Sequence, residues 1–166
     1  TWLALAAQRG DRALFDGYRR GLEATKDPSQ REQLIEGLAY FGDAALRDEA
    51  LRYSLGGSLR MQELLVVPFV QAHALDQRAP VFAWMTERYP QIAQRLPEAF
   101  LPQLAHVAGG CDETLAERAR QFFSQPGRAV PGMSESLAKL RQQVSDCSAL
   151  RRRESAAAGR FLRAGG

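Results

Sequence analysis

The stretch that decides the fold covers residues 58–89 and reads SLRMQELLVVPFVQAHALDQRAPVFAWMTERY. Ser58 gives an N-cap signal, and an apolar run follows over residues 64–70. Pro68 interrupts this run, and after a short polar link Pro80 starts an amphipathic segment. The stretch therefore predicts two helices, the first of which is kinked or broken.

Three segments upstream of this stretch each begin with an aspartate and continue with an apolar stripe at helical spacing. The clearest cap is Asp27, because Pro28 follows it at the first helical position. We expect helices to begin at all three caps and to bury one face each. The caps and their stripes are Asp11 with Leu14, Phe15, Tyr18 and Leu22; Asp27 with Leu34, Ile35, Leu38 and Phe41; and Asp43 with Leu46, Leu51 and Leu55.

The helical pattern continues after residue 89. Three prolines divide residues 90–108 into short helical pieces, because none of them can lie deep inside a helix. Asp112 begins another helix, residues 124–132 read as a loop, and a final helix is expected over roughly residues 133–158. The predicted apolar face of this last helix consists of Leu137, Leu140, Val144, Cys147 and Leu150.

The pattern of elements predicts an all-α fold, since no alternating run bounded by hairpin turns indicates a strand. Successive helices with short links fold back as antiparallel hairpins, and stacked hairpins form an α-solenoid of the HEAT or armadillo kind, although no strict sequence repeat is present. We expect a single helical domain over residues 1–158 and a frayed tail over residues 159–166. Because the chain opens at Thr1 in what reads as the end of a helix, we expect it to be part of a longer protein.

The basic residues are concentrated at the C-terminus. The net charge is +3, and the segment from Arg151 onward carries five arginines against Glu154, which leaves about −1 for residues 1–150. A nucleic-acid groove would place positive charge along the folded body, so the favoured interpretation is a solvated helix end, with nucleic acid or a membrane surface as the alternative. No apolar run is long enough to span a membrane, and no signal peptide is present. The excess of arginine over lysine hints at a bacterial source.

Several pieces of the sequence together resemble one known family. Residues 58–63 follow the order small residue, x, Arg, x, Gln, acidic residue, and an apolar run and then Ala83-Trp84 come after them. Residues 10–51 look like helical hairpins with the recurring order acidic-Pro, then Arg, then Leu-x-x-Leu, then Gly-Asp, and a Phe pair stands at 122–123. This order resembles the all-helical C-terminal domain of zinc aminopeptidases of the aminopeptidase N type, which include the antigen-trimming enzymes of the endoplasmic reticulum.

The resemblance implies a helical bowl that caps a thermolysin-like zinc domain, encloses the chamber over its active site and restricts access to peptides. Catalysis in that family lies in the zinc domain, which carries H-E-x-x-H with a downstream Glu and a G-x-M-E-N motif for the substrate's free amine. Neither motif occurs in this chain. The resemblance therefore implies that the fragment has no catalytic residue and no cofactor, and that zinc, peptide substrates and hydrolase activity belong to the parent enzyme.

The residues themselves offer little catalytic or metal-binding chemistry. The two histidines, His73 and His106, are 33 residues apart, and neither has a second His or an adjacent Glu at helical ligand spacing, whereas zinc needs three or four ligands. No nucleophile elbow, phosphate-binding loop or dinucleotide fingerprint is present. A surface or hydrogen-bonded histidine is therefore the favoured interpretation of both.

Arg60, Gln62 and Glu63 form the polar set with the best claim to a role. The favoured interpretation is that Arg60 and Glu63 tie neighbouring helices together by hydrogen bonds. The alternative is that Arg60 faces the chamber and binds a peptide carboxylate, which suits the guanidinium fork. The aromatic side chains of the deciding stretch are expected in the core, with a domain interface as the alternative; they are Phe69, Phe82, Trp84 and Tyr89.

Cys111 and Cys147 are the only cysteines. Each lies on the apolar stripe of its helix, and in an antiparallel pair their heights differ by only about 3 Å, so they can form a disulfide. The alternative is two small buried thiols in a reduced, cytosolic protein. A disulfide would favour a periplasmic or secreted location.

Two other classes of function compete with an aminopeptidase domain. One is a free-standing helical-repeat scaffold that binds a protein or peptide on its concave face, and the other is an arginine-rich nucleic-acid binder. The coding sequence upstream of Thr1 separates the first two classes, because an H-E-x-x-H there identifies the enzyme.

Overall fold

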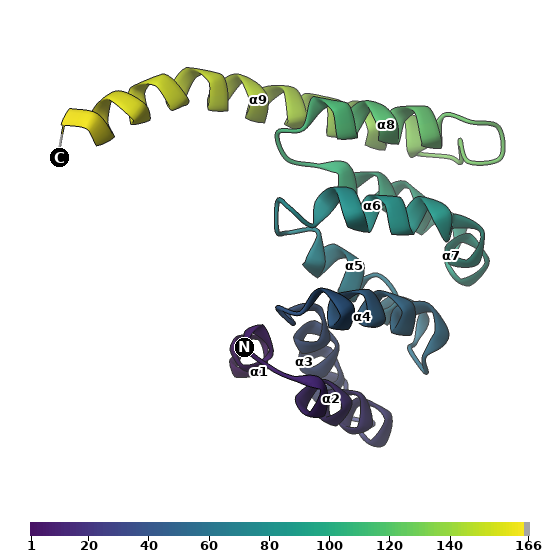
Figure 1. Ribbon diagram of the computed structural model, residues 1–166. Helices are drawn as coiled ribbons and strands as arrows, with labels where there is room; N and C mark the ends of the chain where they lie inside the picture. The colour runs from purple at the N-terminus through teal and green to yellow at the C-terminus, as the bar shows by residue number, and fades with distance from the viewer. Residues whose placement is uncertain (165–166) are drawn as a thin grey trace. The chain divides into compact units, whose positions relative to one another are not determined.

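The computed structural model of the chain is helical throughout and describes residues 1–164, leaving aside the side chains of residues 156–157 and 162–164 (Figure 1). Within these residues it has no strand, so the all-α prediction is confirmed. The chain divides into two compact units, with the boundary between Arg95 and Leu96. No helix of the described residues is both long and apolar enough to cross a membrane.

The first unit contains the three predicted upstream helices and the deciding stretch. Its elements are α1 (Trp2–Gln8), α2 (Arg12–Ala24), α3 (Pro28–Ala39), α4 (Ala44–Gly56), the 3-10 turn η1 (Met61–Glu63), α5 (Val66–Gln71), α6 (Arg78–Glu87) and α7 (Tyr89–Arg95). The three aspartate caps are confirmed, because each carboxylate accepts the backbone N–H three residues ahead at 3.0 Å.

Helix α3 is the centre of the first unit and contacts α1, α2, α4 and α5. Phe15 of α2 packs edge-on against Phe41, with ring centroids 5.2 Å apart, and both are fully buried. Gly37 allows α2 and α3 to approach closely, since a Cβ at this position would lie 2.8 Å from the Tyr18 ring. The predicted stripes thus form one core between these helices.

The deciding stretch breaks earlier than Pro68, at residues 64–65 between η1 and α5. Pro68 then lies in the first turn of α5, where its missing N–H removes no intrahelical bond. The prediction of a cap at Ser58 is wrong: Ser58 lies exposed in a bend, and η1 begins only after Arg60. The reason is that the Glu63 carboxylate accepts the Arg60 N–H at 2.8 Å, which starts the helical turn at that residue instead.

The second unit consists of the 3-10 segment η2 (Glu98–Ala108), α8 (Glu113–Phe123) and α9 (Met133–Ala164), which all contact one another. The Asp112 cap and the loop after α8 are confirmed. Gly110 has φ +102°, a conformation that favours glycine, and it turns the chain from η2 toward α8. The core of this unit includes Leu104, Leu115, Phe123, Met133, Leu140 and Val144.

Helix α9 departs from its predicted face near its end. Leu150, predicted on the apolar face of this helix, is 52% exposed, so the expected burial of that face does not extend to it. The physical reason is that Cys147 of α9 is bonded to Cys111, just ahead of α8, and Leu150 lies past that level. Figure 1 shows α9 continuing past α8 with no other element of the second unit beside its far end. The helix continues to Ala164, past the expected end at 158, and residues 165–166 of the predicted tail lie outside the described residues.

Candidate functional site

The best-defined polar site of the first unit is an ion pair between Arg31 and Glu63. Arg31 stands in the first turn of α3, and Glu63 is the last residue of η1. The guanidinium donates from Nε to one carboxylate oxygen and from Nη2 to the other, both at 2.7 Å. The two side chains are only 7% and 12% exposed. This bidentate, buried geometry is the strong form of an arginine–carboxylate bond.

The third nitrogen of Arg31 extends the site to a further helix. Its Nη1 donates to the carbonyl oxygen of Leu22 at 2.8 Å and to that of Thr25 at 3.4 Å. These carbonyls lie at the C-terminal end of α2, where backbone acceptors lack intrahelical partners. Arg31 thereby joins α2, α3 and η1 through one side chain.

The electrostatics of the pair favour the charged form of both side chains. The hydrogen bonds from Arg31 and from the Arg60 N–H hold the pKa of Glu63 below its ordinary value, and burial opposes them more weakly than Arg31 supports them. The same bond with Glu63 raises the pKa of Arg31. Glu63 is therefore held as a carboxylate between the Arg31 side chain and the Arg60 N–H.

The predicted polar set is only partly brought together. Glu63 ties η1 to α3, but its partner is Arg31, which the analysis of single residues did not select. The Arg60 side chain lies 4.0 Å from Glu63 and is 44% exposed, and Gln62 is exposed. The available signal for Arg31 was the acidic-Pro, then Arg order at Asp27, Pro28 and Arg31.

A second arginine, Arg95 at the end of α7, binds the backbone between α4 and η1. Its Nη1 donates to the Leu55 carbonyl at 2.5 Å and its Nη2 to the Leu59 carbonyl at 2.9 Å. The Leu55 carbonyl belongs to the last turn of α4, so Arg95 satisfies an orphan acceptor there. No sequence signal pointed to this contact, because it joins residues far apart in the chain.

The aromatic and histidine side chains have mainly structural surroundings. Phe82 and Tyr89 are buried as predicted, while Phe69 and Trp84 are half-buried. His73 is exposed, and His106 Nε2 lies 3.1 Å from the Ser136 hydroxyl. Among the described residues no group of three or more His, Cys, Asp or Glu is placed to hold a metal ion.

In the second unit, Cys111 and Cys147 are joined by a disulfide with their Cα atoms 5.0 Å apart. Cys111 lies just ahead of the Asp112 cap of α8, and Cys147 lies in the middle of α9. The Ser148 hydroxyl donates to the Cys111 carbonyl at 3.1 Å, which adds a polar contact at the same level. The bond thus fixes the start of α8 against α9.

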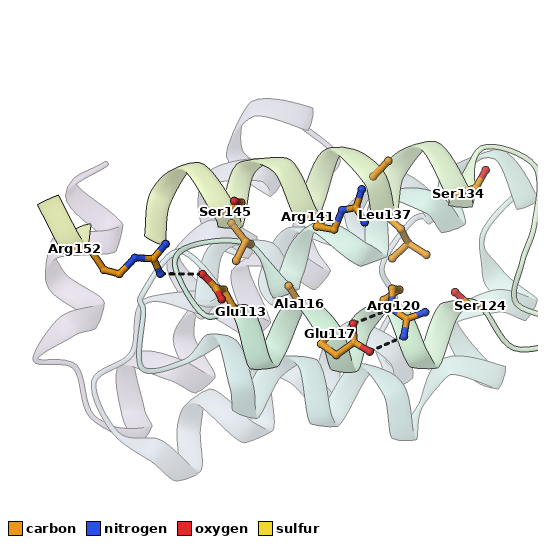
Figure 2. Close-up of a pocket in the computed structure, with 12 residues that line it drawn as sticks. Glu113, Ala116, Glu117, Arg120, Ser124, Ser134, Leu137, Arg141, Ser145 and Arg152 are labelled. Atoms are coloured by element: carbon orange, nitrogen blue, oxygen red, sulfur yellow. Dashed lines mark hydrogen bonds and ion pairs between the residues drawn. The ribbon is translucent and has the colours of Figure 1, made fainter. Parts of the chain in front are cut away.

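A groove of about 660 Å³ lies between the outward faces of α8 and α9 (Figure 2). Its lining includes the small and apolar side chains of Ala116, Leu137 and Ala138. Two exposed ion pairs cross or flank it, Glu117 with Arg120 at 2.6 Å and Glu113 with Arg152 at 3.2 Å. The bond from Arg120 lowers the pKa of Glu117 to about 2. Sequence reasoning missed this groove because it considered only the inward stripes.

Comparison with known families identifies the class of this all-α chain. It belongs to the family described as the ERAP1-like C-terminal domain, whose model matches residues 1–146. The predicted resemblance to the C-terminal domain of aminopeptidases is thereby confirmed. No individual curated protein matches the chain. The family match ends inside α9, directly before Cys147.

Proposed function

We propose that this chain is the non-catalytic C-terminal domain of a zinc-dependent aminopeptidase, and that it caps the active-site chamber and restricts the access of peptides. The observation that carries the proposal is the family match over residues 1–146. The partners are the catalytic domain of the same protein and the peptide substrates. The parent enzyme hydrolyses N-terminal residues from peptides.

Zinc belongs to the catalytic domain in this proposal. The two histidines of this chain do not fit a zinc site, since His106 contacts the Ser136 hydroxyl and, among the residues that the structure describes, neither histidine belongs to a group of three possible ligands. When bound in the parent, zinc supplies Lewis-acid activation of water. In this proposal the residues of this chain form part of the wall of the active-site chamber and take no part in the chemistry.

A solenoid architecture is part of the same proposal. Helix α3 contacts both α1 and α5, so alternate helices follow one another in a row, while α2 and α4 each contact α3 from another side. Ion pairs from Arg12 at 2.7 Å and Arg19 at 3.0 Å to Glu49 link α2 directly to α4. Two such rows are the pattern of stacked helical hairpins.

The proposal is tested on the parent protein. Its coding sequence should contain H-E-x-x-H upstream of Thr1, and the full-length enzyme should release N-terminal residues from peptides in a zinc-dependent manner. The purified 166-residue chain should hydrolyse no amino-acid amide with or without added zinc. Removing residues 1–166 from the parent should reduce its discrimination between short peptides and folded proteins; unchanged discrimination would exclude the capping role.

A free-standing scaffold that binds a protein or peptide is the second candidate. The groove between α8 and α9 is the observation that favours it. A start codon directly before Thr1, together with saturable peptide binding that Leu137→Asp abolishes, would establish the scaffold and exclude the enzyme domain.

A further inference from the structure

The last part of α9, residues 149–164, forms a C-terminal arm that the proposed function does not use. It lies beyond the family match and beyond the disulfide at Cys147. Its residues 149–155 are all exposed, and in Figure 1 no other element of the second unit lies beside its far end. The arm therefore extends past the packed part of the second unit.

The arm carries two large exposed apolar side chains on one line. Leu150 is 52% and Phe161 is 78% exposed. They are 11 residues apart, so at about 100° per residue they differ by only about 20° around the helix axis. Single exposed apolar side chains are common on protein surfaces, so the alignment of these two on one side of the helix is the informative feature.

Arginines flank this apolar line. Arg151 and Arg160 lie about 90° to either side of the middle of this line, whereas Arg152 lies on the opposite face and pairs with Glu113. Glu154 lies close to the line, about 40° from Leu150, and Arg153 beside it binds its carboxylate at 2.7 Å. From this position long arginine side chains can reach a charged surface while the apolar residues between them enter a less polar layer. This is the pattern of a helix that lies in a membrane interface.

We propose that the arm docks on an anionic lipid surface, with Leu150 and Phe161 inserted among the headgroups and the flanking arginines on the lipid phosphates. The charge supports this partner, since five arginines against Glu154 follow residue 150 while residues 1–150 carry about −1. A nucleic acid would account for the arginines but gives no role to the aligned apolar pair. The docking is peripheral and independent of the aminopeptidase assignment.

The test measures cosedimentation of the 166-residue chain with two vesicle preparations, pure phosphatidylcholine and phosphatidylcholine with about 30% phosphatidylglycerol. We expect binding to the anionic vesicles only. Phe161→Ala should weaken it roughly tenfold. Arg151→Gln with Arg160→Gln should weaken it roughly twentyfold, because each arginine contributes about fivefold near an anionic surface. Far-UV circular dichroism verifies that the variants keep their helices.

Arg141→Gln is the matched control, since Arg141 is an exposed arginine of α9 outside the arm, and it should leave vesicle binding unchanged. Equal binding to both vesicles, or none to either, overturns the proposal. So does an Arg141→Gln effect as large as that of the arm variants. Salt-sensitive binding to a single-stranded oligonucleotide that Phe161→Ala leaves intact, without vesicle binding, would assign the arm to nucleic acid instead.

Discussion

The two units fix one of their elements against a neighbouring helix by different interactions. In the first unit, the three-residue turn η1 is too short to hold its own position, and Arg31 fixes it by a buried ion pair with Glu63. In the second unit, the disulfide between Cys111 and Cys147 fixes α8 on the long helix α9. The strength of the ion pair depends on pH and on the burial of its charges, whereas the disulfide depends on the redox state.

The two units should therefore lose stability in different ways when these interactions are removed. A buried ion pair is stabilising only while both partners remain, because a single partner left behind is a buried, unpaired charge. A disulfide acts mainly on the unfolded chain, so its removal loosens the unit without leaving a charge behind. The units can be told apart experimentally, because both tryptophans and all four tyrosines lie at or before residue 89, in the first unit.

Reduction of the disulfide should have the largest effect. The cysteines are 36 residues apart, and the loop-entropy model gives about 3–4 kcal/mol of lost stability for a loop of this size. Hydrogen exchange of α8 and α9 should accelerate in reductant, while the tryptophan fluorescence midpoint in urea stays in place. A joint shift of both signals would show that the units unfold as one and would break the comparison.

Thiol titration of the unfolded, unreduced protein provides the control for this prediction. It should detect no free thiol, and the double variant Cys111→Ser with Cys147→Ser should match the reduced protein and no longer respond to reductant. Two free thiols would contradict the disulfide and, with it, the expectation of a periplasmic or secreted location.

Arg31→Met should have the next largest effect, confined to the first unit. The substitution leaves Glu63 largely buried and removes the donors to Leu22 and Thr25, so we expect a loss of about 3 kcal/mol. Urea unfolding followed by tryptophan fluorescence measures it. Arg20→Met, at an exposed arginine of α2, is the matched control and should change stability by less than about 0.5 kcal/mol.

Acid should weaken the ion pair of the first unit and so lower the stability of that unit. The pKa of Glu63 lies below its ordinary value of 4.5 when folded, so its contribution is complete above that value and is lost as the pH falls through the folded pKa. The stability difference between the wild type and Glu63→Gln should therefore shrink as the pH drops below about 4.5. A difference that is constant from pH 7 to pH 3 would contradict the charged pair.

The contrast also explains which features could be predicted from sequence. Caps such as Asp27 and Asp112 were predictable because their hydrogen bonds reach only three residues along the chain. The pairing of the two cysteines could be predicted because the chain has only two, and helical geometry gives the position of each along its helix. Arg31 and Arg95 bond to groups 32 and 40 residues away, and nothing in the local pattern of an arginine names such a distant partner.

The two corrections have different origins, one local and one tertiary. Serine is a preferred N-cap residue, but at Ser58 no helix begins. The Glu63 carboxylate accepts the Arg60 N–H instead, and the turn starts after Arg60. Leu150 continues the periodic stripe of α9, but the neighbouring helix does not extend that far. Periodicity reports which face of a helix is apolar, and the length of the partner element decides how much of that face is covered.

The smallest expected effect is that of Arg60→Ala. This substitution tests whether Arg60 adds to the stability that the Arg31–Glu63 ion pair provides. The Arg60 side chain is 44% exposed and its Nε is 4.0 Å from Glu63, while its backbone N–H bond to Glu63 survives the substitution. The fluorescence midpoint should therefore shift by about 0.5 kcal/mol or less, since exposed ion pairs contribute little. In the full-length parent, KM for free-acid peptides and for their C-terminal amides should change in proportion. A rise in KM confined to the free acids at unchanged stability would instead make Arg60 a ligand of the peptide carboxylate, and bracing would then belong to Arg31 and Glu63 alone.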